Sequence, residues 1–370
     1  MKLEGLRVVD LSVFLPGPYL TMTLADHGAQ VLKIEPPGGD PGREIGPRVD
    51  GETVFFRNIN RGKDSLVIDL KDPAGRERLL KLCDEADVVV ETFRPGVVQR
   101  LGVDYETVSA RNPGIVYCSI SAFGQDGPYR DRPAHDLAVE ALGGAIAINE
   151  GQDGAPAIPG IPAADMLSSL QGLSGVLMAL LRRERTGRGD YVDMSMHDAV
   201  LAAYPNVVGP VFAHGRDPVP KHERSMGGSA FYRIYATADG RHIVLGGQEA
   251  KFVRNLLSEL QRPDLSALCE AGPGPHQAPV IAFLSEVFAR CSQAEWIDWF
   301  AGRDICFAPV KRVSEAFEDP QALHRGMVLG EGATRQIGPA IKFRHEPARP
   351  RLGVPRLPAE AAPEKSGVGA

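Results

Sequence analysis

The chain has 370 residues and a mass of 39.8 kDa, more than one hydrophobic core usually organises, so we expect about two domains. Hydrophobic residues make up 43% and charged residues 24% of the sequence, which excludes collagenous, disordered and membrane-embedded proteins. The net charge of −6 argues against a broad nucleic-acid-binding surface, and we expect no nucleic-acid partner.

The five cysteines are far apart and form neither a CxxC pair nor a Cys/His cluster at metal-ligand spacing. They indicate reduced thiols and no bound metal. The first residues lack the pattern of an export signal, and no apolar run approaches the roughly 18 residues that span a bilayer. We therefore expect a cytoplasmic protein without membrane association.

The N-terminal half alternates strand and helix patterns. Residues 6–11 (LRVVDL) predict a buried strand that ends before a Pro-Gly-Pro loop, residues 19–28 a helix, and residues 30–34 (QVLKI) a second strand. Three further strands and one helix are expected at 65–70, 87–91, 115–120 and 75–83. This alternation predicts an α/β protein with a Rossmann-like parallel sheet. The G-x-G-x-x-G and P-loop motifs are absent, which removes support for a nucleotide cofactor.

The remaining patterns suggest a second domain. Residues 165–183 carry leucines at spacings of three and four, which predict a long helix. Residues 232–247 read as a β-hairpin with its turn at Asp239-Gly240. We expect a large domain of residues 1–205 plus 330–370, a linker of residues 206–229, and a small α+β domain of residues 230–329.

Four residues occupy positions where chemistry is possible. His135 and Asp136 precede an apolar helical stretch, whose N–H groups would face a developing anion. Asp165 directly precedes a helix, and Glu249 follows a Gly-Gly turn. Taken singly, His135 is more often a structural histidine, the two aspartates are more often helix N-caps, and Glu249 is an exposed carboxylate at a helix start.

Several loops resemble the class III CoA-transferase (CaiB/BaiF) family in the same order along the chain. The matching segments are L-x-G-L-R-V-V-D-L-S-x-x-x-P-G-P, L-A-D-x-G-A-x-V-x-K-I-E-P-P-G-G-D-P-x-R, R-G-K-x-S-x-x-x-D-L-K, F-R-P-G-V-x-x-R-L-G-V, S-x-S-A-F-G-Q-x-G-P-Y and R-x-x-T-G-R-G-x-Y-V-D-M-S-M. The resemblance spans roughly residues 3–350. It implies that the large domain binds CoA and that two interlocked chains form a homodimer.

The family contains two chemistries. In the transferases, the resemblance implies that an Asp at the position of Asp165 is a nucleophile that forms an acyl anhydride and then an enzyme-CoA thioester. In the α-methylacyl-CoA racemases, the same Asp exchanges protons together with a His at the position of His135. Ala134-His135-Asp136 resembles the racemase form, and residues 225–230 (SMGGSA) hold only two glycines, fewer than the mobile loop of formyl-CoA-type transferases.

We therefore expect racemisation or epimerisation of a 2-methylacyl-CoA, a reaction of lipid metabolism. Inversion beside a thioester carbonyl requires a base on one face of the carbon and an acid on the other. His135 and Asp165 would exchange these roles between epimers, and the N–H groups around Asp136 would stabilise the enolate oxygen. The resemblance implies that Glu249 orients His135, from the same or the partner subunit.

CoA is expected as part of the substrate, without a metal or redox cofactor. An acidic protein must gather cations locally for its phosphates, and nine residues lie in loops that match the family's CoA-binding segments. These are Lys33, Pro37, Arg43, Arg61, Lys63, Thr92, Phe93, Arg94 and Arg100. For any single cation among them, a solvated surface charge is an equal alternative.

Two other functions remain open at this point. The first is a CoA-transferase that moves CoA between carboxylic acids through Asp165. The second, from a different class, is a protein that binds CoA thioesters without turnover, although the presence of both His135 and Asp165 makes it the weaker alternative. The acyl chain cannot be read from the sequence, because apolar and Met side chains fill cores and acyl pockets alike.

Overall fold

The computed structural model describes residues 1–151 and 153–357, and contacts within the chain divide it into two units. The first unit contains Met1–Ala145, Pro159–Ala203 and the described chain from Asp319 onward, and the second contains Ile146–Ile158 and Tyr204–Glu318. This division places residues 206–229, where we expected a linker, in the second unit. The chain returns to the first unit at Asp319, earlier than the expected residue 330.

A parallel six-stranded sheet forms the centre of the first unit, with the strand order β5-β2-β1-β6-β7-β8. Its strands are β1 (Arg7–Asp10), β2 (Gln30–Glu35), β5 (Asp64–Val67), β6 (Val88–Glu91), β7 (Val116–Ser121) and β8 (Tyr191–Ser195). Val9 of β1 pairs with Leu32 on one side and with Val89 on the other. Because both faces of the central strands are covered, β1 and β6 are runs of buried valines. The predicted α/β class and Rossmann-like sheet are confirmed.

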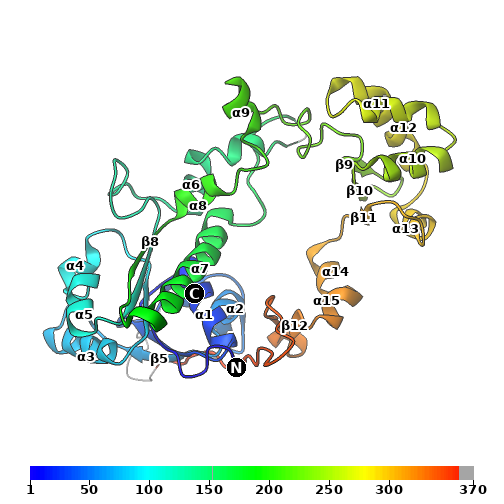
Figure 1. Ribbon diagram of the computed structural model, residues 1–370. Helices are drawn as coiled ribbons and strands as arrows, with labels where there is room; N and C mark the ends of the chain where they lie inside the picture. The colour runs from blue at the N-terminus through cyan, green and yellow to red at the C-terminus, as the bar shows by residue number, and fades with distance from the viewer. Residues whose placement is uncertain (152, 358–370) are drawn as a thin grey trace, which may run out of the picture. The chain divides into compact units, whose positions relative to one another are not determined.

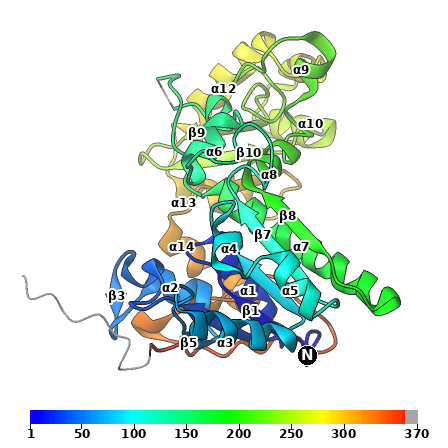
Figure 2. The ribbon, with the colours of Figure 1, turned by 90° about the vertical axis from the view of Figure 1, so that its left-hand side faces the viewer.

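Helices cover both faces of this sheet (Figure 1). α3, α4 and α5 lie on one face, and α1 and α7 lie on the other. The helices of the first unit are α1 (Pro16–Asp26), α2 (Val54–Asn60), α3 (Pro73–Asp84), α4 (Val97–Leu101), α5 (Tyr105–Arg111), α6 (Asp136–Leu142), α7 (Ala163–Thr186), α8 (Met196–Ala202) and α15 (Pro320–His324). The predicted long helix is α7, which packs along β7 and β8 (Figure 2). By length and composition alone α7 could also cross a membrane.

Local sequence explains most element boundaries. α1 begins at Pro16, three residues before the predicted start, because proline fits the first helical position, where its missing N–H costs nothing. The side chain of Asp104 caps α5 by accepting a hydrogen bond from the Thr107 N–H at 3.0 Å. The periodicity did not predict β8, since this edge strand carries one fully buried residue, Ser195, and no regular alternation.

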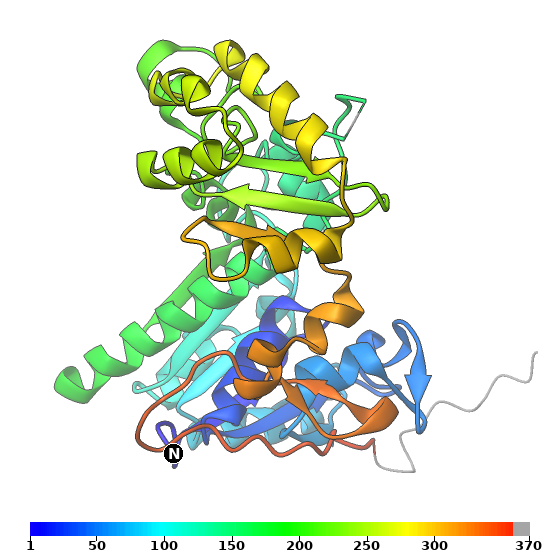
Figure 3. The same ribbon diagram turned by 90° about the vertical axis from the view of Figure 1, so that its right-hand side faces the viewer.

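The second unit has a three-stranded antiparallel sheet in the order β11-β10-β9 (Figure 3). Its strands are β9 (Tyr232–Ala236), β10 (His242–Gly246) and β11 (Phe307–Pro309), and its helices are α9 (Gly209–His214), α10 (Ala250–Glu259), α11 (Ser266–Glu270), α12 (Ala278–Phe288), α13 (Gln293–Phe300) and α14 (Val313–Phe317). The predicted hairpin is confirmed, and Gly240 adopts the left-handed φ of 72° that its turn requires.

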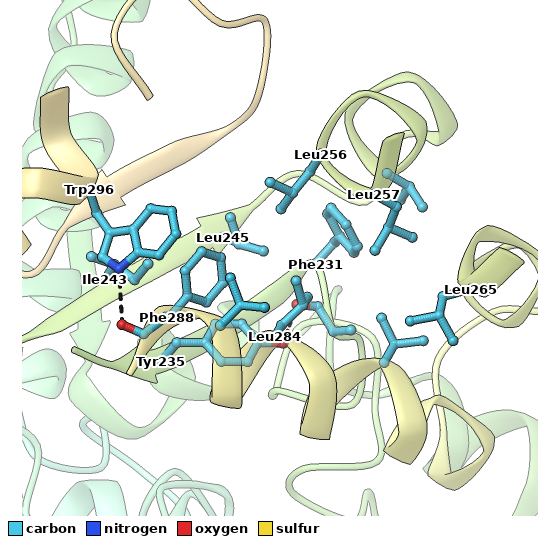
Figure 4. Close-up of a cluster of buried hydrophobic side chains, with 14 of the residues drawn as sticks. Phe231, Tyr235, Ile243, Leu245, Leu256, Leu257, Leu265, Leu284, Phe288 and Trp296 are labelled. Atoms are coloured by element: carbon cyan, nitrogen blue, oxygen red, sulfur yellow. Dashed lines mark hydrogen bonds between the residues drawn. The ribbon is translucent and has the colours of Figure 1, made fainter. Parts of the chain in front are cut away.

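Aromatic and aliphatic side chains from the hairpin, α10, α12 and α13 form the core of the second unit (Figure 4). The indole Nε1 of Trp296 donates to the Phe288 carbonyl at 2.9 Å, which satisfies the only polar atom of this buried ring. Tyr235 packs against Phe288 with ring centroids 5.2 Å apart. This unit therefore has its own hydrophobic core.

The described C-terminal segment returns along the first unit (Figure 3). The Gly62 N–H donates to the Gly353 carbonyl at 2.8 Å, and the Arg43 guanidinium donates to the Pro355 carbonyl at 2.8 Å. Four two-residue strands complete the first unit: β3 (Arg48–Val49), β4 (Glu52–Thr53), β12 (Val328–Leu329) and β13 (Gln336–Ile337). Main-chain contacts thus tie the end of the described chain to the unit that contains β1.

Candidate functional site

A cavity of about 310 Å³ lies in the first unit where β1, β6 and β7 end. The strand order of the sheet changes direction between β1 and β6, and in open parallel sheets ligands bind at the carboxyl ends of the strands beside such a point. Its walls come from the loops after these strands, from residues 130–135 before α6, and from the starts of α7 and α8. The fold therefore predicts the location of the site before any side chain is considered.

The loop after β1 is fixed by a buried aspartate. Asp10 accepts hydrogen bonds from the Ser12 N–H at 3.0 Å and from the Lys63 ammonium at 2.9 Å. Burial acts to raise the pKa of Asp10, but the positive charges of Lys63 and Lys33, with the hydrogen bond from Ser12, lower it to about 2. Asp10 is thus a permanent carboxylate that anchors the loop entering the cavity.

The same loop makes close main-chain approaches. Gly17 lies so near Ser12 that an added Cβ would overlap the serine side chain, which explains the glycine between two prolines. Phe14 adopts a left-handed φ of 62°, a rare conformation for a large side chain. The Thr92 hydroxyl after β6 accepts a hydrogen bond from the Val13 N–H at 2.9 Å, which joins the two loops across the top of the sheet.

A second buried carboxyl group supports the loop after β6. Glu91 accepts a hydrogen bond from the Phe93 N–H at 2.7 Å and another from the Ser119 hydroxyl. Burial raises the pKa of Glu91 to about 7. Phe93 and Arg94 line the cavity. Glu91 therefore fixes the main chain of this part of the cavity wall.

Asp165 lies in the first turn of α7 and lines the cavity. Its N–H donates to the Asp136 carboxylate at 3.0 Å, and the Ala163 N–H donates to the Glu140 carboxylate at 2.8 Å. Burial is the main cause that raises the pKa of Asp165 to about 7, and the negative charges of Asp136 and Glu140 add to it. At neutral pH Asp165 is therefore close to half ionised, which suits either a nucleophile or a proton donor.

The structure brings His135 to the same cavity as Asp165. His135 is the last residue before α6, and its ring meets Phe14 edge to face with centroids 5.9 Å apart. Asp136, by contrast, uses its carboxylate to hold the start of α7. Glu249 belongs to the second unit, where it directly precedes α10.

The predicted CoA-binding residues divide into two groups. Thr92, Phe93 and Arg94 line the cavity, and the guanidinium of Arg100 lies beside Gly96 in the loop that leaves it. Pro37 is exposed in the turn after β2. Every residue of this first group borders the cavity or solvent, where a CoA molecule could reach it.

The second group consists of four buried cations. Lys33 pairs with Asp40, Arg43 with Glu35, Arg61 with Asp26 and Lys63 with Asp10, at distances of 2.8, 2.7, 2.5 and 2.9 Å. These cations are at most 7% exposed. Each neutralises a carboxylate inside the first unit, because a buried carboxylate without a partner would be far more costly. Their contact with the CoA phosphates stays a prediction.

Sequence reasoning missed several residues of this site. Arg130 and Arg132 line the cavity, and the Arg130 guanidinium is held by a hydrogen bond to the Gln125 carbonyl at 2.9 Å. The available signal was two arginines two and four residues before the Ala-His-Asp motif. Glu140 was also missed, although it follows Asp136 by four residues and so had to share its helix face.

The geometry of the titratable side chains does not indicate a metal site. Within residues 1–151 and 153–357, no group of three or more His, Cys, Asp and Glu side chains is placed to hold a metal ion. The polar side chains that line the cavity include three guanidinium groups, the His135 imidazole and the carboxyl groups of Asp131 and Asp165. These groups recognise anions and exchange protons or acyl groups.

Comparison with known proteins agrees with this geometry. A sequence profile described as CoA-transferase family III matches residues 3–360. The chain belongs to CoA-transferase family III. It is therefore an enzyme whose family uses CoA thioesters as substrates.

Named relatives of this CoA-transferase family III enzyme are transferases. The chain is 33% identical to the acetyl-CoA:oxalate CoA-transferase of Acetobacter aceti, over 97% of this chain and 94% of that one. It is 32% identical to the succinyl-CoA:glutarate CoA-transferase of Mus musculus, over 94% and 83% of the two chains. These names support the transferase alternative, whereas the racemase interpretation gains no support from them.

A solved structure shares the fold throughout. A CaiB/BaiF family protein from Brucella suis superposes with a TM-score of 0.83 at 30% identity, covering 97% of each chain. The family suspected from the loop motifs is thus confirmed. The racemase branch, favoured on the Ala-His-Asp motif, was the less well supported choice within it.

Proposed function

We propose that this enzyme transfers CoA from an acyl-CoA donor to a carboxylic acid acceptor by covalent catalysis at Asp165. The observation that carries the proposal is the Asp165 carboxyl group in the lining of a cavity at the carboxyl ends of β1, β6 and β7. Burial raises the pKa of this group to about 7, which makes its carboxylate a stronger nucleophile than that of an ordinary aspartate.

The transfer proceeds through two kinds of enzyme-bound intermediate. The Asp165 carboxylate attacks the thioester carbonyl of the donor and expels the CoA thiolate, which leaves an acyl anhydride. The thiolate then attacks the aspartyl carbonyl, which releases the donor acid and forms an aspartyl-CoA thioester. The acceptor carboxylate attacks this thioester, and the expelled thiolate finally attacks the acceptor carbonyl of the second anhydride, which regenerates Asp165.

Cationic groups on the cavity wall assist these steps. Each attack places negative charge on a carbonyl oxygen, and fixed donors aimed at that charge lower the barrier by about 3 kcal/mol each. The guanidinium group of Arg130 is such a donor. The hydrogen bonds from Arg130 to Gln125 and Asp131 orient it before a substrate arrives.

We propose further that the acceptor is a dicarboxylic acid. The acceptors in the names of the two relatives are oxalate and glutarate, with acetyl-CoA and succinyl-CoA as donors. A second carboxylate needs a cation, and Arg94, Arg130 and Arg132 all line the cavity that contains Asp165. Guanidinium groups bind carboxylates through paired hydrogen bonds. Arg94→Gln should therefore raise KM for a dicarboxylate acceptor at least tenfold and leave KM for a monocarboxylate unchanged.

The Arg94 experiment separates acceptor binding from CoA binding. A rise of KM for the acyl-CoA donor, with KM for the dicarboxylate unchanged, would assign Arg94 to CoA and contradict the dicarboxylate role. Arg48→Gln removes an exposed arginine that pairs with Glu44 and serves as the matched control.

The transferase proposal is tested by following CoA directly. Purified enzyme with acetyl-CoA or succinyl-CoA and a panel of carboxylates should produce new acyl-CoA species, detected by liquid chromatography. Hydroxylamine should trap the intermediates as a hydroxamate on Asp165, found by peptide mass spectrometry. Binding of CoA thioesters without transfer or trapping would favour a non-catalytic protein and contradict the proposal.

A racemase remains a second candidate because His135 and Asp165 line one cavity. If it is correct, a 2-methylacyl-CoA in deuterated water exchanges its α-hydrogen, and His135→Ala abolishes this exchange. A transferase instead retains appreciable CoA transfer in His135→Ala. Exchange without any transfer would replace the main proposal with this one.

Three statements about assembly and location stay predictions. They are the interlocked homodimer, the action of Glu249 on His135 from the same or the partner subunit, and the cytoplasmic location. Sedimentation equilibrium tests the first. Complementation between inactive Glu249→Ala and Asp165→Asn chains, mixed during refolding, tests whether Glu249 acts across a subunit boundary.

A further inference from the structure

We propose that Glu140 is a positioning residue for Asp165: it forms a carboxyl pair with Asp136 that shares one proton and holds the first turn of α7. This inference deepens the proposed function and rests on Asp165 as the nucleophile. Neither the loop motifs nor the family assignment gives Glu140 a role.

The first turn of α7 depends on α6 for its hydrogen bonds. The first N–H groups of any helix lack partners within the helix, and the residue before α7 is Pro162, whose side chain cannot accept one. Glu140 accepts from the Ala163 N–H at 2.8 Å, and Asp136 accepts from the Asp165 N–H at 3.0 Å. Two carboxyl groups of α6 thus cap the helix that carries the nucleophile.

The second oxygen of Glu140 indicates the shared proton. Glu140 is 1% exposed, and among the described residues its Oε2 accepts no hydrogen bond. Asp136 lies one turn earlier on the same helix face. Two adjacent carboxylates repel each other, whereas one proton between them forms a hydrogen bond. Burial raises the pKa of Glu140, and the contact with Asp136 adds to this increase.

The three carboxyl groups lack a cationic partner in residues 1–151 and 153–357. Within the described chain, no lysine or arginine forms an ion pair with Asp136, Glu140 or Asp165, in contrast to the buried aspartates around β1. α8 packs against α6 and carries His197 and Asp198. His197 packs against Phe123 and lies 3.7 Å from the exposed Asp198. His135 and three arginines line the cavity with Asp165, but within the described chain none of them forms an ion pair with the three carboxyl groups. A proton shared between Asp136 and Glu140 reduces the charge of this group without a cation.

The shared proton has a direct consequence for Asp165. A pair with one proton places one negative charge beside Asp165 rather than two, and this limits how far the pKa of the nucleophile rises. The same pair fixes the main chain at residues 163–165. Glu140 therefore acts on the reaction through Asp165, without touching the substrate.

Glu140→Gln and Glu140→Leu separate these two effects. Gln keeps the acceptor for the Ala163 N–H, donates to Asp136, and leaves the pair with one negative charge, as in the protonated pair. Leu removes the acceptor for the Ala163 N–H and fills the volume of the Glu140 side chain. Asp104→Ala is the control, because it removes a carboxylate cap from α5, remote from the cavity lining.

Two measurements on the folded full chain test the proposal. The first is a ¹³C NMR titration of the Asp165 carboxyl, assigned by its loss in Asp165→Asn. The second is the pH profile of kcat and KM for CoA transfer. In Glu140→Gln we expect the pKa of Asp165 to stay within about 0.3 units of the wild-type value, because the neighbouring charge is unchanged. Glu140→Leu should lose at least tenfold in kcat with an unchanged KM for acyl-CoA.

Three results would overturn the proposal. A decrease of one unit or more in the Asp165 pKa of Glu140→Gln would show that the wild-type pair carries two charges. Wild-type kcat in Glu140→Leu would show that the cap does not position Asp165, and an equal loss of kcat in Asp104→Ala would reduce the effect to general stability. If wild-type enzyme shows no CoA transfer, the proposed function fails, but the NMR titration still decides the charge of the pair.

Discussion

Two groups of carboxyl side chains in the first unit, one buried and one only partly buried, have opposite charge balance. Around β1, Asp10 and Asp40 each contact a buried lysine, Lys63 and Lys33. In the second group, Asp136 accepts from the Asp165 N–H and Glu140 from the Ala163 N–H, and within the described chain neither these two carboxyl groups nor that of Asp165 pairs with a cation. The pKa of Asp10 is lowered to about 2, whereas the pKa of Asp165 is raised to about 7.

The difference shows that burial alone does not decide what an aspartate does. Burial acts to raise both pKa values, and a lysine at 2.9 Å reverses its effect only for Asp10. The carboxylates paired with lysine anchor the loop after β1. In the group without a cationic partner, Asp165 titrates near neutral pH. A strongly raised pKa inside a cavity is typical of catalytic residues.

The largest expected effect comes from removing the nucleophile. Asp165→Asn should lose about 10⁴-fold or more in the rate of CoA transfer, because no covalent intermediate can form. Steady-state assays measure the loss, and hydroxylamine should trap nothing. Asp198→Asn alters an exposed carboxylate on α8 and should retain wild-type activity. Substantial transfer by Asp165→Asn would contradict covalent catalysis.

Removing the lysine that neutralises Asp10 should mainly lower the stability of the fold. Lys63→Met leaves Asp10 buried without its closest cation, and we expect the free energy of unfolding to fall by about 3–5 kcal/mol. Urea unfolding followed by circular dichroism measures this change. Lys71→Met, at an exposed position, should change stability by less than about 0.5 kcal/mol. Equal stability of the two variants would show that the buried pair contributes nothing.

The titration of Asp165 should appear in the pH dependence of the rate. Only the carboxylate is nucleophilic, so kcat/KM should rise with pH through a midpoint near 7 and be roughly 100-fold lower at pH 5 than on the plateau. Rates between pH 5 and 9 with one donor and acceptor test this profile. A midpoint near pH 4 would mean that Asp165 titrates like an exposed aspartate.

The last effect concerns stability against pH. A folded-state pKa of about 7, above the unfolded value near 3.9, means that the folded chain binds the extra proton between these pH values. Wild-type stability should therefore fall relative to Asp165→Asn as pH rises from 4 to 7 and stay level above pH 8. Urea midpoints of the two proteins at pH 4, 6 and 8 measure the difference. A constant difference would contradict the raised pKa.

The sheet was predictable from sequence because its signal is local. Runs such as residues 87–91 (DVVVE) show a strand buried on both faces, and the alternation with helices gives the parallel order. His135 and Asp165 were found through motifs at helix starts. β8 was not found by periodicity, because an edge strand with one buried residue lacks the pattern that identifies the others.

The burial and the partners of the charged side chains could not be predicted in the same way. Lys33 and Lys63 stand in loops or strands that match CoA-binding segments, but their burial depends on Asp40 and Asp10, which come from other elements. Glu140 and Ala163 are 23 residues apart and meet only through the packing of α6 on α7. Contacts of this kind depend on tertiary structure and leave no local pattern in the sequence.

The link between α6 and α7 leaves the first unit, because Ile146–Ile158 belongs to the second. Part of the chain between Asp136 and Asp165 therefore belongs to the second unit. The hydrogen bond between these two residues joins positions 29 residues apart. No contiguous fragment of the polypeptide contains the whole first unit without the second. Excising the second unit would cut the chain between α6 and α7 and so separate Asp165 from the helix that caps α7. Transplanting this reaction centre into another scaffold would therefore require a new connection between the two helices.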